Sequence, residues 1–265
     1  METTITEKMI VKKEGGIGWM IFNNPARHNA VSMAMWEAVP VILADFAKDP
    51  EVRVVILAGA GEKAFVSGAD ISEFKEARSS AEASQKYNAA ADAASVALKD
   101  CPKPTIAMIR GYCYGGGVGI AIGCDIRIAS DDSAYSIPAA KLGVGYRYVG
   151  IKRLADLVGF SFVTEIFYTG RRFSGQEALA MGLINRLLPV AELESYTREY
   201  ANTIVNNAPL TIAAVKRCII EYLKDDSERD VAAADKVVNA CFASADYIEG
   251  RDAFMQKRKP VFKGQ

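Results

Sequence analysis

A triple glycine is the stretch of this sequence whose residue types and spacing point most directly to chemistry. Gly115, Gly116 and Gly117 follow an apolar run at residues 105–109 that predicts a buried strand. Residues 118–124 are mostly small or branched and apolar, and they predict a short buried helix. Glycines at a helix start leave N–H groups uncovered at the positive end of the helix dipole. The pattern predicts a place for a phosphate or a forming oxyanion, although a close packing contact would also need these glycines.

A second loop offers backbone N–H groups after another predicted strand. Its residues are Val-Ser-Gly-Ala-Asp at 66–70, and it follows the β-branched run at residues 52–58. If the two strands are neighbours, both loops can direct N–H groups at one carbonyl oxygen. A thioester carbonyl held in this way would be stabilised as an enolate, the charge state shared by many reactions at the carbon next to a carbonyl.

The elements that must position these loops recur as strand–turn–helix units. Strands are predicted at residues 7–13, 17–22, 52–58, 105–109, 126–129 and 182–188, with an extended piece at 134–137 and an irregular loop at 138–148. Helices are predicted at residues 33–48, 77–99, 150–158, 161–169 and 175–181, and only helices follow residue 190. Such recurrence implies a mainly parallel, layered α/β core. The C-terminal helices are expected to pack on this core or on a neighbouring subunit.

Composition argues against several classes of protein. The 265 residues include 32 basic and 32 acidic ones, and this zero net charge argues against nucleic acid as a partner. The five cysteines form no Cys-x-x-Cys pair and no Cys/His cluster, which favours buried thiols over disulfides or a metal site. The N-terminal residues lack an apolar signal segment, and no apolar run reaches membrane-spanning length. We therefore expect a cytoplasmic protein with no metal and no membrane partner.

Common catalytic and nucleotide-binding motifs fit poorly. A P-loop would end in Gly-Lys-Ser/Thr, which is absent. The dinucleotide pattern fails because Ile122 stands where its third glycine belongs. His28 is the only histidine and has no Gly-x-Ser-x-Gly elbow to support a catalytic triad, so a solvated loop residue is the simpler interpretation.

Four segments, in order along the chain, resemble the enoyl-CoA hydratase/isomerase (crotonase) superfamily. They read FVSGADI, GYCYGGGVGIAIGCDIRIAS, FYTGRRFSGQEALAMGLINRLLP and EGRDAFMQKRKPVF. Arg-His-Asn-Ala at 27–30 is similar to the first CoA-contacting loop of that family. The resemblance implies an α/β fold with a crotonase-like ββα spiral core at residues 1–195. It also implies a C-terminal helical oligomerisation region at residues 196–265, in a homotrimer or a dimer of trimers.

The resemblance further implies a ligand and a set of site residues. The ligand is an acyl-CoA thioester, with coenzyme A as part of the substrate and no separate cofactor. The backbone N–H groups of Ser67 and Gly116 would form the oxyanion hole. The residues expected along CoA are Ala26, Arg27, Ala69, Asp70 and Ile71, together with Lys257, which would reach the phosphates from a neighbouring subunit.

The sequence departs from the family's hydratases at two positions. Gly119 and Ala139 stand where those enzymes carry the two glutamates that activate and deliver water. Neither side chain can act as a general acid or base, a contribution of about 10²–10⁴-fold per group. Conventional hydration by these positions is therefore not expected.

The loop at residues 141–151 is most similar to the family's methylmalonyl-CoA decarboxylases, which share its LGV-x-Y run. Loss of CO₂ from a β-carboxyl thioester needs an oxyanion hole but no base to remove a C–H proton. Gly119, Ala139 and Leu142 would line the pocket, and Tyr146 would orient the carboxylate or protonate the enolate, unless it is only a packed aromatic residue.

We therefore expect a decarboxylase or a related lyase step on an acyl-CoA. The match to the decarboxylases is incomplete, because Ala69 and Gly145 replace a histidine and a proline of those enzymes. One alternative is a hydratase, isomerase or thioester hydrolase that works without the usual glutamates. The other is an acyl-CoA-binding protein without turnover.

Overall fold

The computed structural model describes residues 6–70 and 81–265. Its larger sheet has six strands in the order β1-β2-β3-β5-β7-β10. They are β1 (Met9–Glu14), β2 (Ile17–Phe22), β3 (Val54–Gly59), β5 (Thr105–Ile109), β7 (Ile126–Ser130) and β10 (Arg186–Leu188). β1 and β2 form an antiparallel hairpin, and the other neighbours pair in parallel. The predicted mainly parallel α/β core is confirmed.

A smaller sheet of four short strands carries the loops of interest. Its order is β4-β6-β8-β9, with β4 (Ala64–Val66), β6 (Tyr112–Tyr114), β8 (Ala134–Ser136) and β9 (Phe173–Ser174). β3 is followed by β4, β5 by β6 and β7 by β8, and a helix comes after each pair. These repeated pairs are the ββα units of the expected spiral core. β4 and β6 are parallel neighbours, so the two loops that follow them leave the same edge of the sheet.

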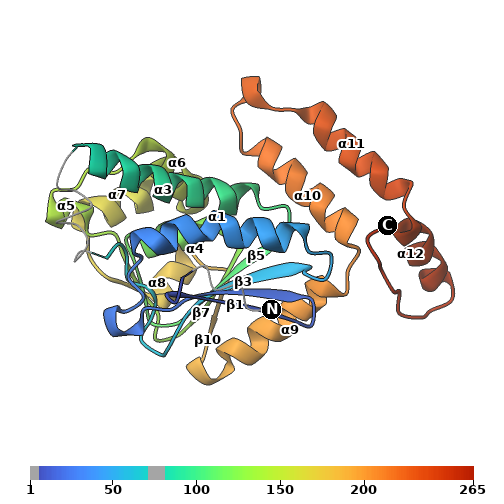
Figure 1. Ribbon diagram of the computed structural model, residues 1–265, viewed down its shortest axis with the longest axis horizontal. Coiled ribbons are helices and arrows are strands. Elements are labelled where there is room, and N and C mark those ends of the chain that lie inside the picture. Colours follow the sequence, from blue (N-terminus) through green and yellow to red (C-terminus); the bar gives the residue numbers. More distant parts are fainter. Residues whose placement is uncertain (1–5, 71–80) are drawn as a thin grey trace.

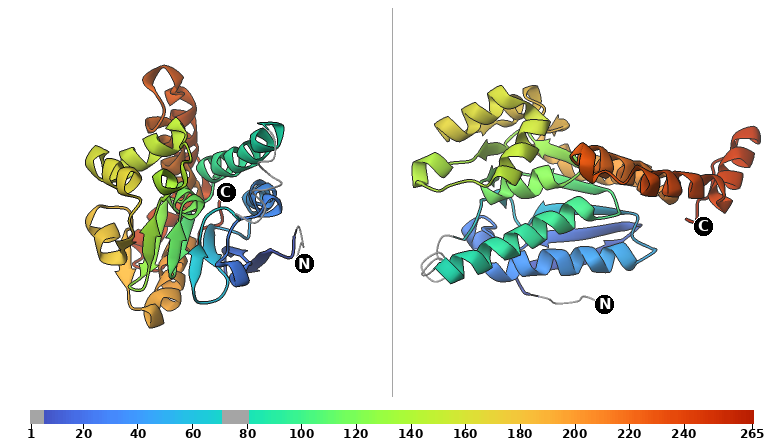
Figure 2. Two further views of the ribbon diagram at one scale, coloured as in Figure 1. Left: turned by 90° about the vertical axis from the view of Figure 1, so that its left-hand side faces the viewer. Right: turned by 90° about the horizontal axis from the view of Figure 1, so that it is seen from above.

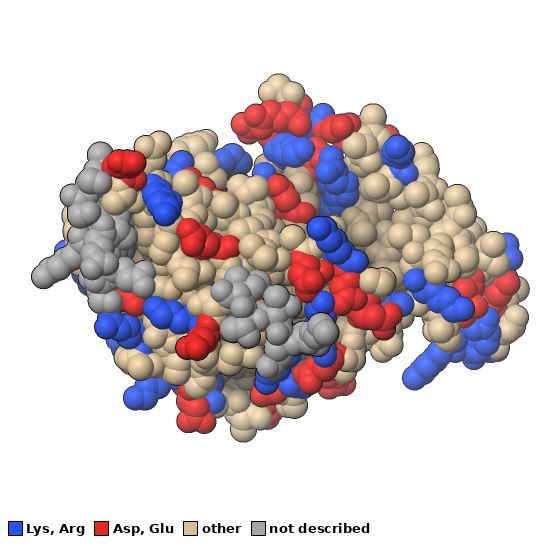
Figure 3. All heavy atoms as spheres, in the orientation of Figure 1, with Lys and Arg blue, Asp and Glu red and all other residues tan. Residues whose placement is uncertain are grey.

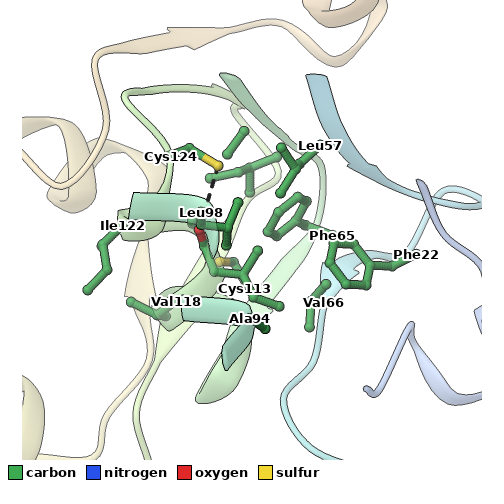
Figure 4. Packing of buried hydrophobic residues seen from close by; sticks show 14 of the residues in the cluster. Phe22, Leu57, Phe65, Val66, Ala94, Leu98, Cys113, Val118, Ile122 and Cys124 are labelled. Atoms are coloured by element: carbon green, nitrogen blue, oxygen red, sulfur yellow. Dashed lines mark hydrogen bonds between the residues drawn. The ribbon is translucent and has the colours of Figure 1, made fainter. Parts of the chain in front are cut away.

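The helices around the sheets bury a continuous apolar core. They are α1 (Met33–Lys48), α3 (Ala81–Asp100), α4 (Gly116–Gly123), α5 (Ala139–Leu142), α6 (Tyr148–Val158), α7 (Phe160–Thr169) and α8 (Gly175–Ala180). α1 and α3 lie side by side (Figures 1 and 2). Figure 4 shows Val118 and Ile122 of α4 near Leu98 of α3, with Phe22 and Phe65 beyond them. The helix that follows the triple glycine is therefore held by the core.

The last strand begins later than the sequence predicts. The Gly182 backbone has φ of +79°, and the N–H of Leu183 donates to the Ala178 carbonyl at 2.9 Å. Residues 182–183 thus end helix α8 by a left-handed cap instead of starting the strand. β10 accordingly covers only Arg186–Leu188.

The C-terminal helices divide into one that covers the core and three that leave it. After a short turn at Val190–Glu192, α9 (Leu193–Val205) packs on the large sheet, and its Leu193 and Ala201 are buried with Trp19 and Ile56. The expected boundary between residues 195 and 196 therefore lies inside a helix of the core. α10 (Pro209–Tyr222), α11 (Val231–Phe242) and α12 (Ala245–Met255), with a short turn at Asp226–Glu228, project from it (Figures 1 and 2). We call residues 209–265 the C-terminal arm.

Polar contacts join the arm to the core at its base. The buried Lys216 ammonium of α10 contacts the Asp125 carboxylate at 2.8 Å and donates to the Lys103 carbonyl at 2.7 Å. The Arg53 guanidinium donates to the Phe262 carbonyl at 2.6 Å. Both ends of the arm's chain are thus bonded to residues that flank the large sheet.

Candidate functional site

The triple glycine forms the turn between β6 and α4, and close contacts explain two of its glycines. Gly115 has φ of +50°, and its N–H donates to the Ser136 carbonyl at 2.8 Å. A Cβ on Gly117 would lie 2.1 Å from the Val66 carbonyl oxygen, so only glycine lets α4 approach β4 this closely. Gly116 is the first residue of α4, and no hydrogen bond within the described residues uses its N–H. This amide lies at the positive end of an eight-residue helix.

Ser67 is not positioned as the second donor. Its N–H donates to the His28 carbonyl at 3.1 Å, and its hydroxyl donates to the Arg27 carbonyl at 3.2 Å. Both polar groups of Ser67 therefore tie its loop to the segment before α1. The expectation that the Ser67 N–H completes an oxyanion hole is wrong, because that N–H already has an acceptor.

The Ala69 amide in this loop is uncommitted. The Val31 N–H donates to the Gly68 carbonyl at 2.8 Å, and the Asp70 N–H donates to the Val31 carbonyl at 3.0 Å. In this parallel bridge, Val31 bonds to the residues on either side of Ala69 and not to Ala69 itself. The Ala69 N–H therefore has no acceptor in the described part of the protein. The Ala69 nitrogen lies 3.9 Å from the position of a Cβ on Gly116. The amides of Ala69 and Gly116 therefore lie close together without protein acceptors, an arrangement suited to one oxyanion.

Two arginines, buried Arg127 and half-buried Arg153, bind the other end of α4. Arg127 donates to the Cys124 carbonyl at 2.8 Å, and Arg153 donates to the Gly123 carbonyl at 3.2 Å. Burial lowers the pKa of both guanidinium groups, but an arginine side chain stays protonated in proteins. Cations at a helix C-terminus complement its negative end. The helix is thereby stabilised with its positive end at the two amides.

The predicted CoA contacts gather around a short turn, η1 (Pro25–Arg27). Ala26 and Arg27 are exposed on this turn, and Arg27 contacts the buried Asp70 carboxylate at 3.2 Å. The structure therefore brings Ala26, Arg27, Ala69 and Asp70 into one neighbourhood at the edge of the amide pair. Ile71 lies outside the described residues.

Buried Asn29 fixes the shape of that turn. Its backbone φ is +56°, its side-chain oxygen accepts from the Asn24 N–H at 2.9 Å, and its amide donates to the Ala60 and Ala64 carbonyls. His28, beside it, is exposed and meets the Tyr112 ring edge to face at 5.6 Å. The exposure of His28 agrees with the interpretation of a solvated loop residue.

A tryptophan that the sequence reasoning missed forms one wall beside the amide pair. Ring atoms of Trp36 lie 3.4 and 3.6 Å from the position of a Cβ on Gly116. Its indole N–H donates to the Tyr87 hydroxyl at 2.8 Å, and both side chains are buried. One signal was present, since Trp36 falls in the first turn of the helix that follows the Arg-His-Asn-Ala loop.

The predicted pocket residues differ in their surroundings. A Cβ on Gly119 would meet no described atom within 4 Å, so the space there is open. Ala139 is buried at the start of α5, whereas the Leu142 side chain is 59% exposed. α5 itself lies in a segment predicted to be an irregular loop.

Tyr146 lies between α5 and α6, and its described contacts are with neighbouring helices. Its ring meets Phe167 edge to face at 4.7 Å and packs near Gly150. No described group forms a hydrogen bond with its hydroxyl, and burial raises the pKa of the phenol. The packed-aromatic interpretation is therefore correct for the ring, while the hydroxyl stays protonated near neutral pH.

Lys257 belongs to the arm. It follows α12, is exposed and has φ of +52°. Figure 1 shows α12 at the end of the molecule away from α4 and α5. A CoA contact from Lys257 would therefore have to come from another copy of the chain, as the sequence prediction states.

One cavity lies in the C-terminal arm, away from the amide pair. It measures about 770 Å³ and lies among α10, α11 and α12, with apolar side chains such as Val215, Ile219 and Phe242 in its wall. Figure 3 shows mostly uncharged atoms over the middle of the arm, with charged side chains toward both of its ends. Across residues 6–70 and 81–265, no helix has the length and apolar character needed to cross a membrane. The same residues hold no cluster of three His, Cys, Asp or Glu side chains suited to a metal ion.

Comparison with known proteins agrees over almost the full chain. The enoyl-CoA hydratase/isomerase family model matches residues 12–265. The chain is 34% identical over 251 residues to a short-chain-enoyl-CoA hydratase of Clostridium acetobutylicum, covering 95% of each. It is 33% identical over 269 residues to a carnitinyl-CoA dehydratase of Escherichia coli K12, covering 98% of this chain and 100% of the relative.

Solved structures of similar proteins have the same fold. An enoyl-CoA hydratase/carnithine racemase from Magnetospirillum magneticum superposes with a TM-score of 0.93 at 33% identity, over 98% of this chain and 97% of that one. An enoyl-CoA hydratase from Bacillus anthracis gives a TM-score of 0.91 at 31% identity, over 98% and 100%. Together with the ββα spiral core, these matches establish that the chain belongs to the enoyl-CoA hydratase/isomerase (crotonase) family, whose members act on acyl-CoA thioesters.

Proposed function

We propose that this enzyme removes CO₂ from a β-carboxy acyl-CoA through a thioester enolate. The observation that carries the proposal is the pair Gly119 and Ala139, which leaves both hydratase carboxylate positions without an acid or base. The amides of Ala69 and Gly116 remain to stabilise an enolate oxygen. Decarboxylation needs the amide pair but not the missing carboxylates, because its leaving group is CO₂ and no C–H proton has to be removed.

In the proposed reaction the thioester oxygen accepts hydrogen bonds from the Ala69 and Gly116 N–H groups. The bond between the α-carbon and the carboxylate carbon breaks, and its electron pair forms the enolate while CO₂ leaves. Negative charge then grows on the oxygen at the positive end of α4, where it is most stabilised. The α-carbon finally takes one proton, which yields the shorter acyl-CoA.

Tyr146 is proposed as the source of that proton. A phenol with a raised pKa is protonated at neutral pH, and it regains its proton from water after giving it to the enolate. The proposed CoA contacts are Ala26, Arg27 and Asp70 from the same chain and Lys257 from a neighbour. Coenzyme A is then part of the substrate, and the chemistry needs no separate cofactor.

Hydration or dehydration is the second candidate, and the names of the relatives favour it. Of the two curated relatives described above, one is a hydratase and the other a dehydratase. An isomerase or thioester hydrolase without the glutamate pair uses the same amides. An acyl-CoA-binding protein without turnover is the non-enzymatic alternative.

Mass spectrometry separates these candidates in one incubation. The purified protein is mixed with methylmalonyl-CoA and crotonyl-CoA, and the products are weighed. We expect methylmalonyl-CoA to lose the mass of CO₂, and Tyr146→Phe to abolish that loss. Tyr148→Phe is the matched control, because Tyr148 is 76% exposed and two residues away. A gain of water by crotonyl-CoA would support the second candidate, and binding of both without change would support the non-enzymatic one.

We also propose that the protein works as a homotrimer or a dimer of trimers. The apolar cavity of the arm and the distance of Lys257 from the amide pair of its own chain support assembly. A near-zero net charge favours self-association as well.

A further inference from the structure

Gly119 differs from the other glycines of α4 in what surrounds it. A Cβ on Gly116 would meet the Trp36 ring at 3.4 Å, one on Gly117 would meet the Val66 carbonyl at 2.1 Å, and one on Gly123 would meet Leu98 at 3.1 Å. A Cβ on Gly119 would meet no atom of the described chain within 4 Å. The described residues therefore do not fill this position.

Neither the backbone nor the packing requires glycine at 119. The residue lies within the helix, and it is not among the glycines with positive φ. Glycine inside a helix is less favourable than alanine, because it loses more conformational freedom on folding. A glycine that costs helix stability, and beside which no described residue lies, points to a requirement for space that a ligand can use.

The open position faces the amide pair. Each Cα–Cβ bond in a helix tilts toward the N-terminus, and residues three apart lie on one face. The space at Gly119 therefore opens toward the N–H of Gly116, one turn earlier. Trp36 closes the side at Gly116 itself, so the side at Gly119 is the one with room.

We propose that Gly119 is a specificity determinant that makes room for a branch on the α-carbon of the substrate. The inference rests on the proposed function for the position of the thioester. With the carbonyl oxygen on the two amides, the α-carbon is one bond from the carbonyl carbon, and its substituents reach the open space. A methyl or carboxylate branch would occupy the volume, which a linear acyl chain does not need. The substrate class is thus an α-branched acyl-CoA.

Two isomeric ligands test this directly. Butyryl-CoA and isobutyryl-CoA contain the same atoms, but only the second is branched at the α-carbon. Their affinities are measured by calorimetry for the full-length wild type, Gly119→Ala and Ser95→Ala. The last variant is the control, because it also places alanine inside a helix, at an exposed position of α3 outside the arm.

We expect the wild type to bind isobutyryl-CoA at least as tightly as butyryl-CoA. Gly119→Ala should weaken isobutyryl-CoA about tenfold or more through overpacking and leave butyryl-CoA within about threefold. Its Tm should equal or exceed that of the wild type, which separates a filled pocket from a damaged fold. Ser95→Ala should leave both affinities unchanged.

Equal losses for both ligands, no loss for either, or no binding by the wild type would overturn the inference. The reaction assignment fails separately. If the wild type discriminates as expected but releases no CO₂ from methylmalonyl-CoA, the role of Gly119 stands and the proposed decarboxylation does not. If CO₂ is released and Gly119→Ala weakens the binding of both ligands equally or of neither, the proposed decarboxylation stands and the role of Gly119 does not.

Discussion

At the scale of single residues, the site depends on which backbone amides lack an acceptor. Ser67 and Ala69 are two positions apart, and the sequence alone gives no reason to prefer the second. The bridge between Val31 and Ala69 determines which amide is available, because it uses the Asp70 N–H and leaves the Ala69 N–H free of described partners. An oxyanion hole is therefore a property of pairing between distant segments, and residue type carries little information about it.

This distinction predicts that turnover depends on the backbone N–H at position 69. Ala69→Pro removes the N–H and should lower turnover by about 10²–10³-fold, the usual cost of losing one oxyanion donor. Ala69→Gly keeps the N–H and should retain most activity. Ser67→Ala loses only the hydroxyl contact to Arg27 and should change turnover by less than about threefold. Steady-state rates with the substrate found by mass spectrometry check the series, and an Ala69→Pro variant with wild-type turnover would contradict the assignment.

At the scale of elements, α4 and β4 approach each other at a contact that only glycine permits. A Cβ on Gly117 would meet the Val66 backbone, which cannot move without displacing β4 from β6. Gly117→Ala should therefore destabilise the protein by about 1–3 kcal/mol and lower Tm by several degrees. Thermal unfolding compared with Gly119→Ala checks this, and a Gly117→Ala variant as stable as the wild type would refute the contact.

A second element-scale prediction concerns the C-terminal segment, which Glu249 holds against α12. Its carboxylate accepts from the Arg258 guanidinium and the Val261 N–H, and the hydrogen bond from Arg258 is the main cause that lowers its pKa to about 2. A lowered pKa contributes stability that is present above about pH 4.5 and is lost as pH falls toward 2.

Hydrogen exchange should therefore show the amide of Val261 protected at pH 5 and losing protection between about pH 4.5 and 2. Glu249→Gln should be less protected at pH 5 and lack the dependence on pH in that window. A wild type whose tail is equally protected at both ends of the window would contradict this account.

The elements that could not be predicted from the sequence are too short to show the regular spacing of apolar residues that marks a strand or a helix. β6 is three residues long and exists because β4 and β8 pair with it on both sides. α5 is one turn that ends where Gly143 adopts φ of +64°. The long elements, such as α1 and β5, show clear apolar patterns and were predicted within about two residues. The two loops that carry the uncommitted amides are both visible in the sequence, whereas the hydrogen bond from the Ser67 N–H to the His28 carbonyl is not.

At the scale of the whole molecule, the arm exposes apolar surface that a monomer does not need. Ile219 is 52% exposed, Phe242 is 63% exposed, and both line the cavity among α10, α11 and α12. Exposed apolar patches of this kind mark interaction sites. Because Lys257 lies on the same arm, an assembly that covers the arm can also bring this lysine to a neighbour's CoA.

Light scattering during size-exclusion chromatography should therefore report a trimer or hexamer for the wild type. Ile219→Glu places a charge in the cavity and should shift the protein toward smaller species, while weakening CoA thioester binding through the loss of the neighbour's Lys257. Val96→Glu is the control, since Val96 is 55% exposed on α3 and outside the arm. Lys257→Ala should reproduce the loss of binding without the change in mass. A monomeric wild type that binds CoA thioesters normally would refute the coupling, because its site would then be complete within one chain.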